Sequence, residues 1–292
     1  MMRPIKETPV LPFMNPNSFT NRFPITSFLL LLNVGFFVLQ WISAQKLGNT
    51  IELNELGQGM NADSLIARDL GAIHSGSIFK DGQYWRFISG TFLHGGIAHV
   101  LMNSWVLADL GQFCEPRLSR SKFFSVYMLS ALAGAIATYS WAAVSLTFNS
   151  NLGVSLDDAI SILLGQAPAT VPGDVLNYCS AHTSVGCSGA LAGLIGMLLV
   201  YSIKERHAAL RAMLVRWILL IAVITFILPN IDHAGHLGGL VVGGICGLTM
   251  DDYATSKTSL RWRIPAGLAG IAMVWALAQA VHNLAQARWS LD

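Results

Sequence analysis

Seven apolar stretches of the chain approach the ~20 residues that an α-helix needs to cross a lipid bilayer. The fifth and sixth are separated only by Asp232 and His233, which predicts a tight turn between them. The pattern predicts an all-α, polytopic membrane helical bundle without a linker or repeat. The stretches are Thr26–Ala44, Ile97–Phe113, Phe123–Phe148, Gly186–Ile203, Trp217–Ile231, Ala234–Met250 and Ile264–Val281.

Composition agrees with an integral membrane protein. Hydrophobic residues make up 53% of the 292 residues and charged residues 12%, whereas soluble domains carry roughly 25% charged residues. The first 25 residues lack an apolar core, so we expect no cleavable signal peptide and a first span that stays as an anchor. The expected surroundings are the lipid bilayer, and we expect no nucleic-acid partner.

The distribution of Lys and Arg predicts the orientation. Thirteen of the 18 lie on one set of flanks, namely Arg3, Lys6, Arg22, Arg117, Arg120, Lys122, Lys204, Arg206, Arg211, Arg216, Lys257, Arg261 and Arg263. The other flanks hold Lys46, Arg68, Lys80, Arg86 and Arg288. Because cytoplasmic loops are rich in Lys and Arg, the N-terminus is expected in the cytoplasm and the C-terminus outside. The segment 149–185, which has three acidic residues and no Lys or Arg, suits the outside.

In this orientation spans two, four and six all run from outside to inside. His99 and Asn103, Ser188, and His236 then lie in the first turns of these spans, at one depth near the outer face. Ionisable residues inside a membrane are candidates for function by default. We therefore ask whether these side chains meet.

A serine hydroxyl is a weak nucleophile until a base within about 2.6–3.2 Å takes its proton, and His236 is the candidate base. Small residues at helical spacing follow both: Ala192 and Gly196 after Ser188, and Gly239, Gly243 and Gly247 after His236. Such faces allow membrane helices to approach closely. We predict that spans four and six touch, with Ser188 and His236 within hydrogen-bond reach.

Acyl transfer also needs donors aimed at the developing oxyanion. His99 and Asn103 are four residues apart and share a helix face, so they could supply such donors together with the Ser188 backbone N–H. His94 lies just before this helix. Asp232 fits better as the N-cap of span six than as a third catalytic residue, which leaves a Ser–His dyad.

Other interpretations remain open for each residue. Gly-x-Ser-Gly in a glycine-rich helix is usually a packing motif, and a membrane histidine is often a proton relay or an interhelical contact. Metal binding by the histidines is disfavoured because no His-Glu-x-x-His or carboxylate–His set accompanies them. A transporter is disfavoured by the lack of buried acids and of an inverted repeat. Cys179 and Cys187 could pair, although sequence alone cannot establish this. The histidines in question are His94, His99, His233 and His236.

Four separated motifs together resemble the rhomboid intramembrane serine proteases. They are Trp85-Arg86, His94 with His99-Val-Leu-Met-Asn103, Gly186-Cys187-Ser188-Gly189, and His236-Leu-Gly-Gly239 followed by Gly243. The resemblance covers roughly residues 83–249. It implies that Ser188 is the nucleophile and His236 the base, that His99 and Asn103 serve the oxyanion, and that His94 and Arg86 order the first outer loop.

The resemblance also implies a domain plan and a function. A cytoplasmic tail (1–25) would precede a six-span catalytic core (26–250), and residues 251–292 would add a cytoplasmic loop, a seventh helix and a short outer tail. The expected function is hydrolysis of peptide bonds near the outer end of substrate transmembrane helices, without cofactor or metal. The alternative is a catalytically silent protein that binds membrane proteins. A bacterial inner membrane is the expected location.

The sequence departs from the family pattern in three places. Ser119 follows Glu115-Pro116-Arg117-Leu118, where the family often has a glycine. Where relatives often carry an aromatic residue packed on the histidine, this chain has Ala192, so the orientation of His236 must come from elsewhere. The outer segment 149–185 is longer than a minimal loop. Within it, Leu156–Leu164 could form a short amphipathic helix on the membrane.

Overall fold

The computed structural model describes residues 19–46, 63–148, 153–164, 166, 171, 183–227, 231–248 and 260–289. The long helices are α2 (Pro24–Lys46), α6 (Ile97–Cys114), α7 (Arg120–Val144), α10 (Ser188–Lys204), α11 (Ala208–Ile227), α12 (His233–Leu248) and α13 (Leu260–Trp289). The shorter elements are α1 (Phe19–Arg22), α3 (Asp63–Asp69), β1 (Ile73–His74), α4 (Ser75–Asp81), α5 (Arg86–Ser89), η2 (Gly90–Phe92), η3 (Ser145–Phe148), α8 (Leu156–Leu163) and β2 (Thr183–Ser184).

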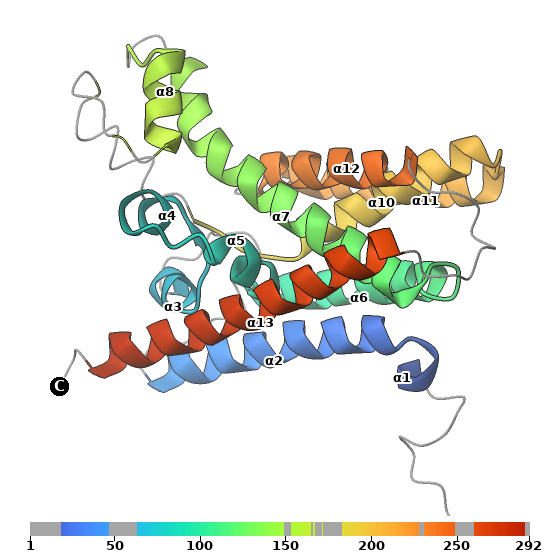
Figure 1. Ribbon diagram of the computed structural model, residues 1–292, viewed down its shortest axis with the longest axis horizontal. Helices are drawn as coiled ribbons and strands as arrows, with labels where there is room; N and C mark the ends of the chain where they lie inside the picture. Colours follow the sequence, from blue (N-terminus) through green and yellow to red (C-terminus); the bar gives the residue numbers. More distant parts are fainter. Residues whose placement is uncertain are drawn as a thin grey trace, which may run out of the picture.

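Helix α10 lies at the centre of the bundle. It packs against α12, α7, α11 and α6, while α12 also packs on α7, and α2 packs on α6 (Figure 1). One cluster of buried hydrophobic residues draws members from all seven long helices, among them Leu29, Leu107, Phe123, Leu194, Leu214, Cys246 and Met273. The core is therefore a single apolar interior shared by the whole bundle.

Each of the seven predicted spans falls on one long helix, but several bounds differ. Helix α11 begins at Ala208 rather than Trp217, because the Arg-containing segment before Trp217 is made of good helix formers and simply extends the span. Helix α13 is likewise longer than predicted at both ends. Residues 228–230 and 249–250, at the predicted ends of spans five and six, lie outside the described residues.

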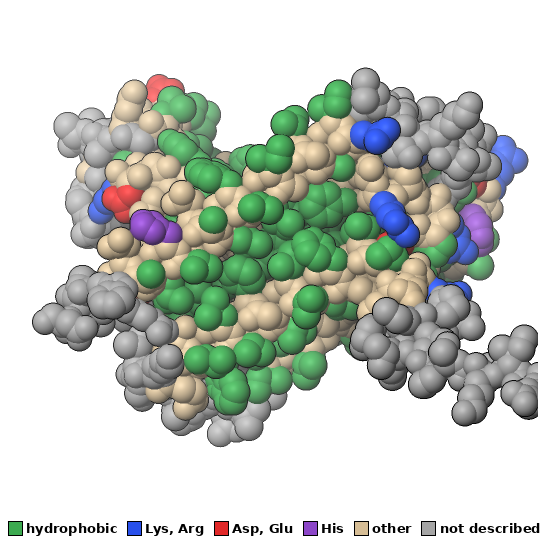
Figure 2. Space-filling model, turned by 60° about the horizontal axis from the view of Figure 1, so that its bottom comes forward, with side chains coloured by type: hydrophobic (Ala, Val, Ile, Leu, Met, Phe, Trp, Pro, Cys, Tyr) green, Lys and Arg blue, Asp and Glu red, His purple; other side chains and the backbone are tan. Residues whose placement is uncertain are grey.

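The chain is an integral membrane protein. By length and composition, three helices of the described residues can cross a membrane: Pro24–Gln45, Arg120–Phe148 and Trp262–Gln286. Helices α10 and α12 are apolar but shorter. On the face shown in Figure 2, hydrophobic side chains cover the middle of the molecule and the charged side chains lie toward its two ends.

Residues 63–96, the first loop of the structure, form a compact folded unit between α2 and α6. It contains α3, α4 and α5, and its strand β1 pairs antiparallel with β2, which lies just before α10; Ile73 opposes Ser184 and His74 opposes Thr183. This two-residue ladder was not predicted from the sequence. It ties the segment that leads into Ser188 to the first loop.

The segment 149–185 contains the short helix expected from its sequence. Helix α8 is held at its start by a reciprocal capping box between Ser155 and Asp158. Its Ala159 and Ile162 are buried in a small cluster with Ala143, near the end of α7, and Leu146 of η3. Most of residues 165–182 lie outside the described part of the chain.

Helices α10 and α12 approach until their backbones touch. A Cβ atom added to Gly239 would overlap the carbonyl oxygen of Gly189, and one added to Gly243 would overlap that of Gly193. The predicted contact between spans four and six is thus correct, and Gly196 faces α12 as expected. The small residues of α10 that face α12 nevertheless include Gly189 and Gly193, whereas the sequence analysis placed Ser188 and Ala192 on this face.

Gly243→Ala should destabilise the bundle by about 1–3 kcal/mol, because the added methyl group has no room against the α10 backbone. Thermal unfolding in detergent measures the effect. Gly270→Ala is the matched control, since a Cβ atom at this α13 position meets nothing within 4 Å. Equal unfolding temperatures for the two variants would contradict the backbone contact.

Candidate active site

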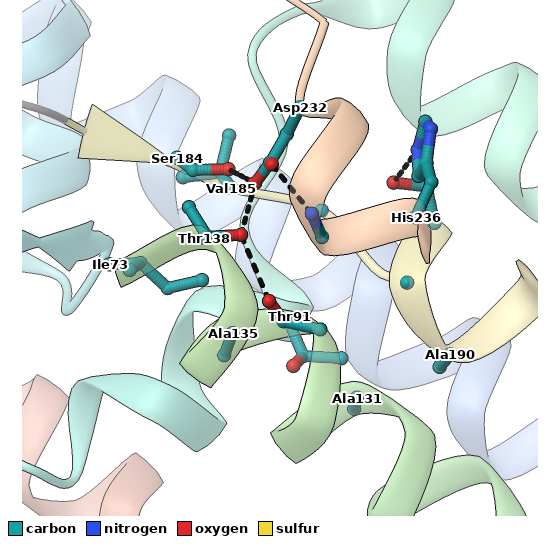
Figure 3. A pocket seen from close by; sticks show the side chains of 15 residues that line it. Ile73, Thr91, Ala131, Ala135, Thr138, Ser184, Val185, Ala190, Asp232 and His236 are labelled. Carbon is teal, nitrogen blue, oxygen red and sulfur yellow. Dashed lines mark hydrogen bonds between the residues drawn. The ribbon is translucent and has the colours of Figure 1, made fainter. Parts of the chain in front are cut away.

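Ser188 and His236 are in direct contact. The Ser188 Oγ and His236 Nε2 atoms are 2.7 Å apart, across the top of the α10–α12 interface (Figure 3). The prediction that these side chains lie within hydrogen-bond reach is confirmed. Both are partly buried, so the pair is neither sealed in the core nor fully exposed.

Ser188 is the first residue of α10 and not two residues inside it, as the sequence suggested. The helix cannot begin earlier because Gly186 adopts φ +122°, a backbone conformation that only glycine adopts readily. The Gly186 N–H donates to the Gly90 carbonyl at 3.0 Å, which anchors this turn to the first loop. The Ser188 N–H therefore belongs to the first turn, whose amides have no acceptor within the helix.

Gly186 also leaves room for His99 and Asn103. A Cβ atom at Gly186 would lie 2.9 Å from His99 Nε2 and 3.5 Å from Asn103 Nδ2, so both side chains converge on this turn. The Gly95 N–H donates to His99 Nδ1 at 3.3 Å, and in a neutral imidazole the proton is then on Nε2. Asn103 is buried, and its Nδ2 has no hydrogen-bond partner among the described residues.

His94 lies behind His99 rather than in the dyad. Its ring is buried and meets the His99 ring edge to face at 5.1 Å. The backbone of His94 is held on both sides by Gln40 of α2, whose Nε2 donates to the His94 carbonyl at 2.9 Å and whose Oε1 accepts from its N–H at 3.4 Å. Sequence reasoning missed Gln40, and its only signal was a polar residue in an apolar span.

Cys187 is a buried free thiol, so the disulfide left open from the sequence is not formed at this residue. Its Sγ lies 3.5 Å from Asn33 Nδ2 and 3.9 Å from His94 Nε2. Cys179 lies outside the described residues.

Arg86 is buried in the first loop, away from the dyad. Its guanidinium donates to Gln83 Oε1 at 2.7 Å, to the Ala72 carbonyl at 3.1 Å and to the Arg68 carbonyl, and it stacks on the Trp85 ring. Burial lowers the pKa of Arg86 to about 10, opposed in part by the charge of Asp69. These contacts fasten the end of α3 to α5.

Asp232 is the N-cap of α12, as the sequence favoured. Its Oδ1 accepts from the Gly235 N–H at 2.7 Å. Its Oδ2 accepts from the hydroxyls of Ser184, at 2.7 Å, and Thr138. Thr138 and Ser184 were not identified from the sequence, where nothing distinguishes them from other hydroxyl residues.

A small cavity adjoins the dyad. It has a volume of about 20 Å³ and is lined by Ser188, His236, Thr138, Ser184 and Asp232 together with small residues of α7 and α10 (Figure 3). This is enough for about one water molecule, and the lining supplies several polar partners for it.

The remaining histidine of span six lies apart from this arrangement. His233 is the first residue of α12, where the sequence suggested a turn, and it is exposed. Within the described residues, no three His, Cys, Asp or Glu side chains come together in a group that could hold a metal ion.

Comparison with known proteins gives one family. A family model described as the rhomboid domain matches residues 81–252, more than half of the chain. Rhomboid protease GluP of Bacillus subtilis (strain 168) is 26% identical over 196 residues, which cover 66% of this chain and 30% of that protein. RHOMBOID-like protein 5 of Arabidopsis thaliana is 27% identical over 188 residues, covering 63% and 49%.

A relative from a third organism has a similar identity. Rhomboid-like protease 1 of Toxoplasma gondii is 27% identical over 207 residues, which cover 68% of this chain and 58% of that protein. In each of these three relatives the matched region spans less than two thirds of the protein.

Proposed function

This chain belongs to the rhomboid family, and on that premise we propose that it is an intramembrane serine endopeptidase with Ser188 as nucleophile and His236 as general base. The observation that carries the proposal is the 2.7 Å contact between Ser188 Oγ and His236 Nε2. A base within about 2.6–3.2 Å of a hydroxyl can take its proton during attack.

The reaction follows from this contact. Ser188 Oγ attacks the carbonyl carbon of the scissile peptide bond while its proton passes to His236 Nε2. His236 then gives this proton to the departing amine, which leaves an acyl group on Ser188. A water molecule, deprotonated by His236, hydrolyses the ester and regenerates the serine. The small polar cavity beside the dyad is a suitable place for that water.

His99, Asn103 and the Ser188 N–H stabilise the oxyanion in this proposal. The support is the unpartnered Asn103 Nδ2 and the proton on His99 Nε2, both next to Gly186. A buried donor without a partner is costly in a folded protein, and the cost is offset when the reaction supplies an acceptor. Gly186, Gly189 and Gly239 support the site by allowing the close approach of these groups.

The substrates in this proposal are transmembrane proteins, cut in or near the outer end of a helix. Six spans form the catalytic core and α13 adds the seventh, with the N-terminus in the cytoplasm and the dyad toward the outer side. A bacterial inner membrane fits this plan, and the chemistry requires no cofactor.

Ser188→Ala should abolish cleavage and leave the protein folded, because it removes only a hydroxyl from a partly exposed position. The measurement is incubation of the purified full chain with labelled single-span membrane proteins, followed by separation of the fragments. Cleavage by the folded wild type and none by the variant is expected. A folded wild type that cuts no member of a broad substrate panel would favour a silent membrane-binding protein.

His236→Ala should be inactive, whereas His233→Ala should keep most of its activity. Only His236 contacts Ser188; His233, three residues earlier in the same helix, is exposed. The two variants form a matched pair and are assayed on one substrate in detergent. The reverse order of activities would overturn the assignment of the base.

Asn103→Ala and His99→Ala should each turn over about 10²–10³ times more slowly, the usual effect of removing one oxyanion donor. The measurement is kcat of each variant against the wild type on one substrate, with KM determined in the same assay. Unchanged turnover in both variants would exclude these side chains from the oxyanion site.

A further inference from the structure

Asp232 carries a carboxylate that joins three separate elements beside the dyad. One oxygen accepts from the Gly235 N–H of α12 at 2.7 Å; the other accepts from Thr138 of α7 and, at 2.7 Å, from Ser184 of β2. Figure 3 shows these bonds converging on Asp232 while the Ser188–His236 contact lies to one side. The carboxylate therefore bonds to the frame of the site and not to the reacting atoms.

Ser184 and Asp232 stand in matching positions relative to the two residues of the dyad. Ser184 lies four residues before the nucleophile, and Asp232 lies four residues before the base. The bond between them thus connects the segment leading into α10 with the segment leading into α12. Thr138 belongs to α7 and its hydroxyl, which donates to Asp232, also lies 3.0 Å from the Gly134 carbonyl of the same helix, so its single proton is shared between the two acceptors and the link is fixed to α7.

The location of the dyad creates a need for such a link. Ser188 is the first residue of α10 and His236 the fourth of α12, and helix ends tend to fray. The Ser188 amide has no acceptor within its helix, whereas the His236 amide donates to the Asp232 carbonyl at 3.2 Å. The close packing of α10 on α12 reaches Gly235, one residue before His236, whose carbonyl oxygen would lie 3.2 Å from a Cβ atom on Gly189. This packing fixes how near the helices lie, but the segment leading into Ser188 precedes α10 and needs a link of its own, since proton transfer over about 3 Å tolerates little error.

The groups that donate hydrogen bonds to the Asp232 carboxylate are suited to holding it in one position. In the described part of the chain, the three donors to Asp232 are two hydroxyls and one backbone amide, all uncharged. Hydrogen bonds to an ionised carboxylate are roughly twice as strong as those between neutral groups. Thr138 is buried and Asp232 is partly buried, which limits competition from bulk water.

We propose that Asp232 is a positioning residue that sets the distance between Ser188 and His236 by binding Ser184 and Thr138 while it caps α12. This inference rests on the proposed protease function. Asp232 acts through the backbone of the nucleophile segment and of α12, so it belongs to the catalytic site without touching the substrate.

Substitutions can separate the cap from the brace. Asp232→Asn keeps a good N-cap but loses the charged oxygen that accepts from two hydroxyls. Ser184→Ala removes only the link to the nucleophile segment. Thr138→Val removes the link to α7, and Thr138→Ser restores the hydroxyl. Ser202→Ala is the matched control, because Ser202 is a buried serine of α10 whose hydroxyl donates to the Leu199 carbonyl in its own helix at 2.7 Å.

The experiment uses the full chain in detergent and three measurements: the rate at which a fluorophosphonate probe labels Ser188, kcat and KM on a labelled single-span substrate, and the unfolding temperature. Ser184→Ala, Thr138→Val and Asp232→Asn should lower the labelling rate and kcat by about ten- to a hundred-fold with KM unchanged. Thr138→Ser and Ser202→Ala should match the wild type. The double variant Ser184→Ala with Asp232→Asn should be labelled little more slowly than Asp232→Asn alone, because both substitutions break the same Ser184–Asp232 hydrogen bond.

The possible outcomes are distinct. If Ser184→Ala is labelled as fast as Ser202→Ala, the brace does not position the dyad and the inference is wrong. Loss of activity that tracks the unfolding temperature and is not recovered by Thr138→Ser would reduce Asp232 to a structural cap. A folded wild type that is neither labelled nor active would instead remove the protease function itself. Should Asp232→Asn fail to fold, Ser184→Ala and the Thr138 pair still decide.

Discussion

The contact between the backbones of α10 and α12 is the constraint on which the rest of the site depends. In a membrane, lipid and apolar side chains are alike, so helices associate through close packing rather than through exclusion of water. Gly189 and Gly193 of α10 face Gly239 and Gly243 of α12 with no space for a Cβ atom on the latter pair. A wider interface would move the tops of the helices apart, and the 2.7 Å contact between Ser188 and His236 could not form.

Polar groups in this apolar frame fall into two classes. Some are satisfied: Glu115, which is buried, accepts from the Ile25 N–H at 2.8 Å and from the N–H and hydroxyl of Thr26, and so caps the start of α2. Others are not: ten buried side-chain atoms of the described residues lack a hydrogen-bond partner, and Asn103 Nδ2, next to Gly186, is one of them. An unmet buried donor costs free energy in the folded state, and in the proposed mechanism the oxyanion would supply the acceptor that Asn103 lacks.

Sequence reasoning found the long helices and the meeting of Ser188 with His236, because hydropathy, charge asymmetry and glycine spacing are local signals. It misjudged the start of α10, since the φ of Gly186 depends on its bond to Gly90 and on the space that His99 occupies. It also missed Ser184, Thr138 and Gln40. Each of these acts through a partner at least 48 residues away, and no periodicity in the chain encodes such a pair.

The position of the dyad in two first turns reflects a single physical requirement. Amides at the start of a helix have no acceptor within it and carry a partial positive charge, so they can serve a developing oxyanion. In the proposed mechanism, placing Ser188 at the first position of α10 gains this donor but leaves the nucleophile on the least constrained part of the helix. The ladder between β1 and β2, the Gly186–Gly90 bond and the Asp232 carboxylate all brace that region from other segments. The donor proposed for the oxyanion and the need for these braces thus have the same origin, the placement of Ser188 at the start of its helix.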